Sequence, residues 1–346
     1  MTVKASVFQL LKELKADVDK YIFEFLPINH EIPEIELLYK MMRDYPSRSG
    51  KGLRPGLLML FNRALGGRDE FSLNSAAALE LFQNWIVIHD DIEDFSDLRR
   101  GLPALHVKYG VPLALNAGDA LAGKMWELVL KNTEIIGIEK GVRVFGEFLY
   151  MYDQTTAGQH IELSWVVQNR WNISQEDYFN MCRRKTAWYT CITPCWAGAL
   201  IAGIDDFYKN EVINFGMDLG IAFQIQDDVL NLVADIGKYG KEIAGDLWEG
   251  KRTLVIIDLL GKCTEAERKF VVQALNLPRD KKDDKDIEIV MDLIKKYDSI
   301  TFAAGISQEH ARKARKIFVD SIAPLMNNDY RDIILELIEF IVNREL

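Results

Sequence analysis

Apolar side chains recur every three or four positions along almost the whole of this 346-residue chain. This spacing most limits the fold, because it is the period of a helix with one buried face. No stretch shows the alternation of a half-buried strand, and neither a fixed repeat nor a low-complexity linker divides the sequence. The sequence therefore predicts an all-α fold, with one domain spanning residues 1–346 and ten or more helices.

Local signals place the helices along the chain. Two capping-box patterns, Ser174 with Asp177 and Thr264 with Glu267, predict helix starts. The glycines and proline of residues 47–55 predict a turn that displays Lys51. Residues 276–286 form a charged surface loop by composition. We expect helices at about 5–26, 35–42, 55–65, 73–96, 112–132, 139–167, 174–202 and 206–234, and two or three more within 286–345.

Residues 80–101 combine a helical apolar face with an acidic cluster. Asp90 and Asp94 fall one turn apart on nearly the same side of the expected helix, where two carboxylates repel unless a cation lies between them. By itself this pattern also fits a solvated acidic helix end. A second acidic pair, Asp227 and Asp228, follows another apolar run, and a pair of arginines follows the first cluster. These two features favour a binding site.

Basic residues accompany the two acidic clusters in chain order, and the set predicts a central cavity that is rimmed by Lys and Arg. Mg²⁺ suits such carboxylates, since it takes one or two protein oxygens and completes its shell with water and phosphate. The ion would act as a Lewis acid toward a departing diphosphate. No P-loop, Rossmann fingerprint or H-E-x-x-H motif competes with this reading. The basic residues are Lys51, Arg54, Arg99, Arg100, Lys185, Lys241 and Lys251. Asp246 lies between the last two of them.

Composition excludes several other classes. The net charge of -10 and the pI near 5.2 argue against nucleic acid as a partner. The four cysteines show neither a zinc pattern nor a disulfide framework. The N-terminus lacks the apolar core of a signal peptide, and no run reaches the ~18 apolar residues of a membrane span. We expect a cytoplasmic protein.

Five blocks in this order resemble those of the trans isoprenyl diphosphate synthases, or polyprenyl synthetase family. The first acidic motif is DDIED at 90–94 with RRG at 99–101, and the second is FQIQDDVLN at 223–231. The other blocks are GKGLRP at 50–55, KTAWY at 185–189 and GKEIAGDLWEGKRT at 240–253. The resemblance implies the family's all-α fold around a central cavity.

The same resemblance assigns roles to individual residues. Three Mg²⁺ ions would be ligated by Asp90, Asp94 and Asp227, with Asp91, Asp228 and Asp246 in support. The allylic diphosphate would be held by Arg99, Lys185 and Lys241. Isopentenyl diphosphate would bind Lys51, Arg54, Gln83 and Arg100. Thr186 and Gln224 would line the reacting centre with Lys185.

The reaction that the resemblance implies needs no side-chain nucleophile or general base. The allylic carbon–oxygen bond ionises, the isopentenyl double bond attacks the cation, and a proton is lost to the released diphosphate. Three positions depart from the usual motifs. Asn231 stands where many members have Asp, Gln83 replaces His, and Glu162 replaces Asp. None of them removes a charge that the chemistry requires.

Product length in this family depends on bulky side chains of the first-motif helix. One turn rises ~5.4 Å, close to one isoprene unit. Trp85 lies five residues before Asp90, which resembles archaeal geranylgeranyl diphosphate synthases and predicts a C20 product. The larger Trp ring could instead stop growth at C15, and C25 is a third alternative. The indole could also simply anchor helix packing.

Other functions remain possible at this point. A class I terpene cyclase would share the ionisation step but lack the isopentenyl site, whose basic residues are present here. A non-catalytic synthase subunit would tend to lose acidic motifs, whereas both are kept. The expected partners are isopentenyl diphosphate and an allylic diphosphate, together with a second copy of the chain in a homodimer.

Overall fold

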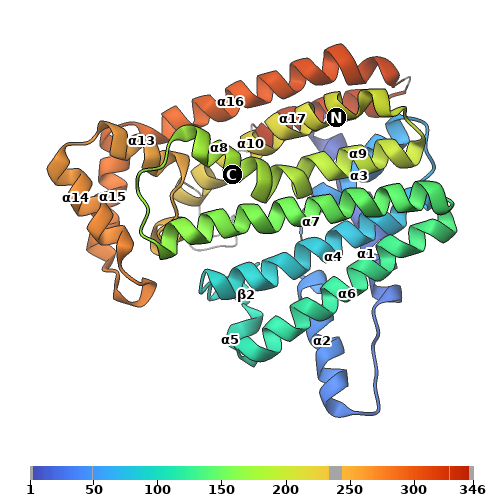
Figure 1. The fold of residues 1–346 in the computed structure, drawn as a ribbon, viewed down its shortest axis with the longest axis horizontal. Coiled ribbons are helices and arrows are strands. Elements are labelled where there is room, and N and C mark those ends of the chain that lie inside the picture. Colours follow the sequence, from blue (N-terminus) through green and yellow to red (C-terminus); the bar gives the residue numbers. More distant parts are fainter. Residues whose placement is uncertain (1–2, 49, 234–243, 327, 343–346) are drawn as a thin grey trace. The chain divides into compact units, whose positions relative to one another are not determined.

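The structure is a computed structural model that describes residues 3–48, 50–233, 244–326 and 328–342. These residues are almost entirely helical, as predicted (Figure 1). None of their helices is long and apolar enough to cross a membrane. The α-helices are α1 (Val3–Phe25), α2 (Pro33–Ser47), α3 (Leu53–Ala64), α4 (Asp69–Glu93), α5 (Leu105–Tyr109), α6 (Val111–Ile135), α7 (Ile138–Val167), α8 (Gln175–Cys182), α9 (Thr193–Ala202), α10 (Lys209–Val233), α12 (Gly245–Glu249), α13 (Leu254–Lys262), α14 (Glu265–Asn276), α15 (Asp284–Lys296), α16 (Ser299–Ile317) and α17 (Tyr330–Val342).

Shorter helical segments complete the chain. Both predicted capping boxes are confirmed, at the starts of α8 and α14. The helix predicted over 174–202 is confirmed from Gln175 to Ala202, although its middle, η1 (Arg183–Ile192), is π-helical and lies between α8 and α9. The other short segments are η2 (Asp206–Tyr208), η3 (Arg279–Lys281), η4 (Phe318–Ile322) and η5 (Ala323–Leu325).

The prediction of no strand is wrong at one small hairpin. Strand β1 (Leu98–Arg99) pairs antiparallel with β2 (Leu102–Pro103). The two residues between them, Arg100 and Gly101, have φ values of 52° and 75°. Positive φ at both central positions is the geometry of a tight hairpin turn whose twist matches the strands. The R-R-G motif is therefore a turn that fixes its two arginines.

Contacts group the chain into two compact units. The first unit is Met1–Tyr152, Tyr189–Asn214 and Ile317–Leu337. Within it, α4 packs on α6 and α3, and α3 packs on α9. A Cβ added at Gly198 of α9 would lie 2.3 Å from the carbonyl oxygen of Leu58 on α3, so these helices touch through backbone. The single domain around one cavity stays a prediction.

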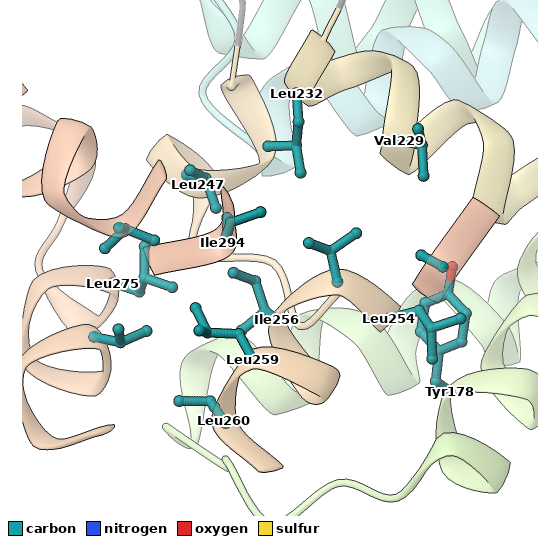
Figure 2. Close-up of a cluster of buried hydrophobic side chains, with 14 of the residues drawn as sticks. Tyr178, Val229, Leu232, Leu247, Leu254, Ile256, Leu259, Leu260, Leu275 and Ile294 are labelled. Carbon is teal, nitrogen blue, oxygen red and sulfur yellow. The ribbon is translucent and has the colours of Figure 1, made fainter. Parts of the chain in front are cut away.

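The second unit is Asp153–Trp188, Phe215–Lys316 and Ile338–Leu346. Its core is a cluster of buried apolar side chains to which α8, α10, α12, α13, α14 and α15 contribute (Figure 2). Leu254, Ile256 and Leu259 of α13 are fully buried in it. Because Tyr178 of α8 and Val229 of α10 belong to the same cluster, the core supports α10, which carries the second acidic motif, and packs α8 beside it.

Candidate functional site

The first acidic motif lies at the C-terminal end of α4. Asp91 is fully buried, whereas Asp90 and Asp94 are partly exposed. The Asp94 N–H donates to the Asp90 carbonyl over 2.8 Å, which carries the helical hydrogen bonding to Asp94. Asp90 and Asp94 are thus one helical turn apart, as their spacing predicted, and Asp91 is directed into the core.

The buried carboxylate of Asp91 is fully engaged. The Tyr45 hydroxyl of α2 donates to its Oδ2 over 2.5 Å, and the Arg99 guanidinium of β1 donates to Oδ1 over 2.8 Å through Nε. The Leu105 N–H donates to the Tyr45 oxygen over 3.2 Å, which leaves the hydroxyl proton for Asp91. Burial and the Asp91 charge raise the pKa of Tyr45. Arg99 also lies near the exposed carboxylate, with Nη2 3.6 Å from Oδ2 of Asp90.

The hairpin and the end of α2 hold each other. Arg48 donates to the carbonyls of Arg99 and Pro103 over 3.0 and 2.9 Å. In return, Arg100 donates to the carbonyls of Arg48 and Tyr45 over 2.8 and 3.1 Å. These charge-assisted bonds to the backbone fix both arginines of the R-R-G motif.

Arg100 lies in a cluster of positive charge. Burial lowers the pKa of its guanidinium, and the charges of Arg99, Arg54 and Arg48 lower it further, while Glu80 opposes them. Like charges held together in a partly buried place disfavour the cationic form unless an anion binds. The cluster therefore suits a diphosphate, and it includes Arg54 and Arg100, which were assigned to isopentenyl diphosphate.

The glycine-rich turn lies beside this cluster. A Cβ at Gly50 would lie 3.2 Å from Nη2 of Arg100, so the two segments are in contact. Arg54 donates to the Thr190 hydroxyl over 2.9 Å, and its guanidinium carbon is 4.3 Å from the centre of the Tyr189 ring. The first unit thus brings together the GKGLRP and RRG blocks, which are far apart in sequence.

Two further residues assigned to isopentenyl diphosphate lie in the first unit. Lys51 is exposed. Oε1 of Gln83 is buried and has no hydrogen-bond partner among the described residues. Buried polar atoms without partners are unusual and often mark a missing ligand or water. The amide oxygen needs a donor such as water, and the amide nitrogen is the group that would donate to a diphosphate.

Trp85 belongs to an aromatic cluster of the first unit. It is 8% exposed, and its ring stacks on Tyr152 of α7 with centroids 5.5 Å apart and planes at 14°. Phe82 meets it edge-on at 5.5 Å, and Trp126 of α6 contacts Tyr152 at 6.1 Å. The indole therefore does anchor helix packing, and its role in product length stays a prediction.

In the second unit, the part of η1 that carries Lys185 and Thr186 lies against α7 and α10. A Cβ at Gly158 of α7 would lie 2.1 Å from the Lys185 backbone nitrogen, and one at Gly220 of α10 would lie 2.4 Å from Cα of Ala187. Single π-helical segments are frequent at functional sites. Two glycines thus allow both helices to contact the backbone of the KTAWY block.

Glu162 forms an ion pair with Lys185. The carboxylate lies on α7, is 7% exposed, and accepts from the Lys185 ammonium. Sequence reasoning assigned no role to the Glu that replaces the usual Asp. Here its charge balances a lysine that was assigned to the allylic diphosphate.

A chain of hydrogen bonds joins the second acidic motif to η1. Thr186 donates to Oε1 of Gln224 over 2.5 Å, and Nε2 of Gln224 donates to Asp228 over 2.7 Å. The Tyr178 hydroxyl of α8 donates to the other Asp228 oxygen over 2.6 Å. Burial raises the pKa of Asp228, and the hydrogen bonds from Tyr178 and Gln224 oppose the shift. Asp227 is less buried than Asp228.

Asn231 contacts the start of the segment at residues 244–253, the described part of the GKEIAGDLWEGKRT block. Its side-chain oxygen accepts from the Asp246 N–H over 3.1 Å, and its carbonyl accepts from the Ala244 N–H over 2.8 Å. The amide therefore orders α12, which the sequence did not predict. Lys251 pairs with Glu249 over 2.7 Å.

The structure leaves the metal assignment untested. Among residues 3–48, 50–233, 244–326 and 328–342, no three His, Cys, Asp or Glu side chains gather as a metal site. The donors of each motif still fit Mg²⁺, because partly exposed carboxylates are its usual protein ligands and water or phosphate completes its shell. Lys241 lies outside the described residues.

Sequence reasoning missed the residues that support the motifs. Tyr45 and Tyr178 occupy buried positions that read as core, and Arg48 lies in a turn beside Lys51. Their partners are 46 and 50 residues away for the two tyrosines. No spacing in a single sequence signals such contacts.

Known proteins resemble the chain over most of its length. A geranylgeranyl diphosphate synthase of Sulfolobus acidocaldarius is 35% identical over 83% of this chain and 84% of its own. A geranylfarnesyl diphosphate synthase of Natronomonas pharaonis is 28% identical over 99% of both chains. The crystal structure of geranylgeranyl pyrophosphate synthetase from Pyrococcus horikoshii has a TM-score of 0.87 and 31% identity, with 99% of each chain covered.

The family comparison agrees with these relatives. Residues 35–294, which include every motif quoted above, match the polyprenyl synthetase family. The relatives and the solved structure cover well over two thirds of the chain at identities above 30% in two cases. The all-helical fold is the same. The chain therefore belongs to the polyprenyl synthetase family and is a prenyltransferase.

Proposed function

We propose that this prenyltransferase joins isopentenyl diphosphate head-to-tail to an allylic diphosphate and releases all-trans geranylgeranyl diphosphate, C20. The observation that carries the condensation is the arginine cluster of the first unit. It holds Arg54 and Arg100 close enough for their charges to interact, beside Gly50 of the glycine-rich turn. A terpene cyclase has no second diphosphate to bind and no need of this cluster.

The residues of each unit would contribute in a distinct way. In the first unit, Arg100, Arg54, Lys51 and Gln83 would bind isopentenyl diphosphate, and Arg99 would bind the allylic diphosphate. Arginine forks match phosphate oxygens well, and water-excluded charge stabilises a leaving group strongly.

In the second unit, Lys185 would bind the allylic diphosphate, with its ammonium oriented by Glu162. The oxygens of Thr186 and Gln224, which their mutual bond holds in place, would face the allylic cation. No side chain acts as nucleophile or general base, and the released diphosphate takes the proton.

The carboxylates would hold the metal ions. Asp90 and Asp94 in the first unit and Asp227 in the second are the partly exposed donors. Three Mg²⁺ ions, when bound, would supply the Lewis acid that stabilises the departing diphosphate. Asp91 and Asp228, whose oxygens accept hydrogen bonds inside the protein, would support the ligands.

Product length rests on Trp85 and on the names of relatives. The Sulfolobus and Pyrococcus proteins are named for a C20 product, and Trp85 stands five residues before Asp90. The Natronomonas relative, named for a C25 product, favours C25 as the second candidate. C15 remains the alternative that follows from the size of the indole.

A second copy of the chain is the expected partner. In the first unit, α6 and α7 expose large apolar side chains, among them Leu130 at 60% and Ile138 at 76%. Exposed apolar side chains that adjoin one another mark an interface, and we propose this role for those of α6 and α7. We expect a homodimer, which light scattering of the purified protein would show; a monomer at micromolar concentration would contradict it. The cytoplasmic location stays a prediction.

The test of the reaction is consumption of isopentenyl diphosphate by the purified protein alone. Incubation with Mg²⁺ and each of the C5, C10 and C15 allylic diphosphates should release diphosphate only when isopentenyl diphosphate is present. Release from an allylic diphosphate alone would indicate a cyclase. No release with any primer would instead support a non-catalytic subunit.

A further inference from the structure

The two acidic motifs are built in the same way. In each unit a buried tyrosine from a separate helix donates its hydroxyl to Oδ2 of the second aspartate. Tyr45 of α2 donates to Asp91 over 2.5 Å, and Tyr178 of α8 donates to Asp228 over 2.6 Å. Both tyrosines are at most 1% exposed. Each pair lies within one unit.

The other oxygen of each second aspartate is also occupied. Arg99 donates to Oδ1 of Asp91, and Gln224 donates to Oδ1 of Asp228. The helices and the donors differ between the motifs, so the shared feature is the arrangement itself. Two donors hold the second carboxylate, while the preceding aspartate remains partly exposed.

A carboxylate with both oxygens engaged keeps one orientation. An ionised carboxylate accepts hydrogen bonds only, and rotation about its χ angles would leave two buried donors without an acceptor. The carboxylate of the second aspartate therefore does not rotate toward a bound cation. It also does not displace the carboxylate of the preceding aspartate from that cation. Partners of this kind are known to orient metal ligands, and their loss weakens metal binding by 10–100-fold.

We propose that Tyr45 and Tyr178 are positioning residues for the divalent-cation sites. Each fixes the second aspartate of its motif and thereby holds the neighbouring Asp90 or Asp227 in the orientation that binds the ion. The proposal rests on the metal-dependent reaction proposed above, and it assigns a role to two residues that touch no substrate.

Replacement of each tyrosine by phenylalanine keeps the ring and removes one hydroxyl. In Tyr45→Phe, Oδ2 of Asp91 and the N–H of Leu105 both lose their partner. In Tyr178→Phe, Oδ2 of Asp228 loses its donor. The freed carboxylates reorient, so affinity for the ion falls. Arg54 and Arg100 keep their own partners, Thr190 and the backbone carbonyls of Tyr45 and Arg48.

Two other tyrosines provide matched controls. Tyr21 donates its hydroxyl to Asn74 over 3.1 Å in the first unit, and Tyr297 donates to Glu267 over 2.6 Å in the second. Tyr21→Phe and Tyr297→Phe also remove one hydroxyl hydrogen bond, but neither partner belongs to an acidic motif. Thermal stability of all four variants separates a general loss of stability from a local effect.

The experiment measures Mn²⁺ binding to the full chain by electron paramagnetic resonance, with inorganic diphosphate present. We expect Kd to rise tenfold or more in Tyr45→Phe and in Tyr178→Phe, and to stay within twofold of wild type in the two controls. The Mg²⁺ concentration that half-activates turnover should rise in parallel, with kcat at saturating Mg²⁺ changed less.

Two results would overturn the proposal. One is Mn²⁺ affinity within twofold of wild type in both variants, and the other is equal weakening in the controls. If one variant does not fold, the other tests the same statement in its own unit. The two proposals can fail separately. If the tyrosine variants bind Mn²⁺ more weakly than wild type, but wild type consumes no isopentenyl diphosphate, the proposed reaction is refuted and the role of the tyrosines is supported.

Discussion

Gly158→Ala should lower both the catalytic rate and the stability of the protein. The added Cβ would lie 2.1 Å from the Lys185 nitrogen, a backbone atom that no rotamer change can move. Ordinary contact begins at 3.4 Å, so η1 has to shift by about 1.3 Å, the difference between 3.4 and 2.1 Å. Misplacement by about 1 Å costs on the order of 100-fold in rate, and overpacking costs about 1–3 kcal/mol of stability.

The assay is kcat with isopentenyl and allylic diphosphates, together with thermal unfolding. Gly146 provides the control, since it lies on the same helix and a Cβ there meets nothing within 4 Å. Gly146→Ala should keep full activity and gain about 0.5–1 kcal/mol of stability. Wild-type kcat in Gly158→Ala would refute the reasoning that the glycine positions Lys185.

The remaining predictions concern single residues. Asp90→Ala should abolish turnover and leave the helical circular dichroism unchanged; near wild-type turnover would contradict the metal assignment. Asn231→Ala should lower the free energy of unfolding by about 1 kcal/mol, because the Asp246 N–H loses its acceptor. The pKa of Glu267 is lowered to about 2, chiefly by Lys296. The stability that ionised Glu267 contributes should be complete above the pKa of this group in the unfolded chain, and it should be lost as pH falls toward 2. The melting temperatures of wild type and Glu267→Gln should therefore converge on acidification.

Much of the fold follows from local signals. The two capping boxes appear where a hydroxyl and an acid stand three residues apart. The short helix predicted at 35–42 is longer, α2 at Pro33–Ser47, because Pro33 suits a helix start and apolar spacing continues to Tyr45. Such features depend on residues within a turn or two of each other.

The features that sequence reasoning missed depend on distant partners. The π-helical segment η1 lies against Gly158 and Gly220, and neither glycine signals by itself what backbone approaches it. Tyr178 reads as an apolar core residue until the structure shows its hydroxyl on Asp228. Asn231 stands out in the sequence only as a departure from the usual Asp, although in the structure its side-chain oxygen accepts from the backbone of α12.

The most direct test of the account is product length from wild type and Trp85→Ala, with Mg²⁺, isopentenyl diphosphate and the C5, C10 and C15 primers, resolved by chromatography. We expect C20 from wild type and longer products from Trp85→Ala, because the indole lies five residues before Asp90. A wild-type product of C15 or C25, or an unchanged length in Trp85→Ala, would contradict it.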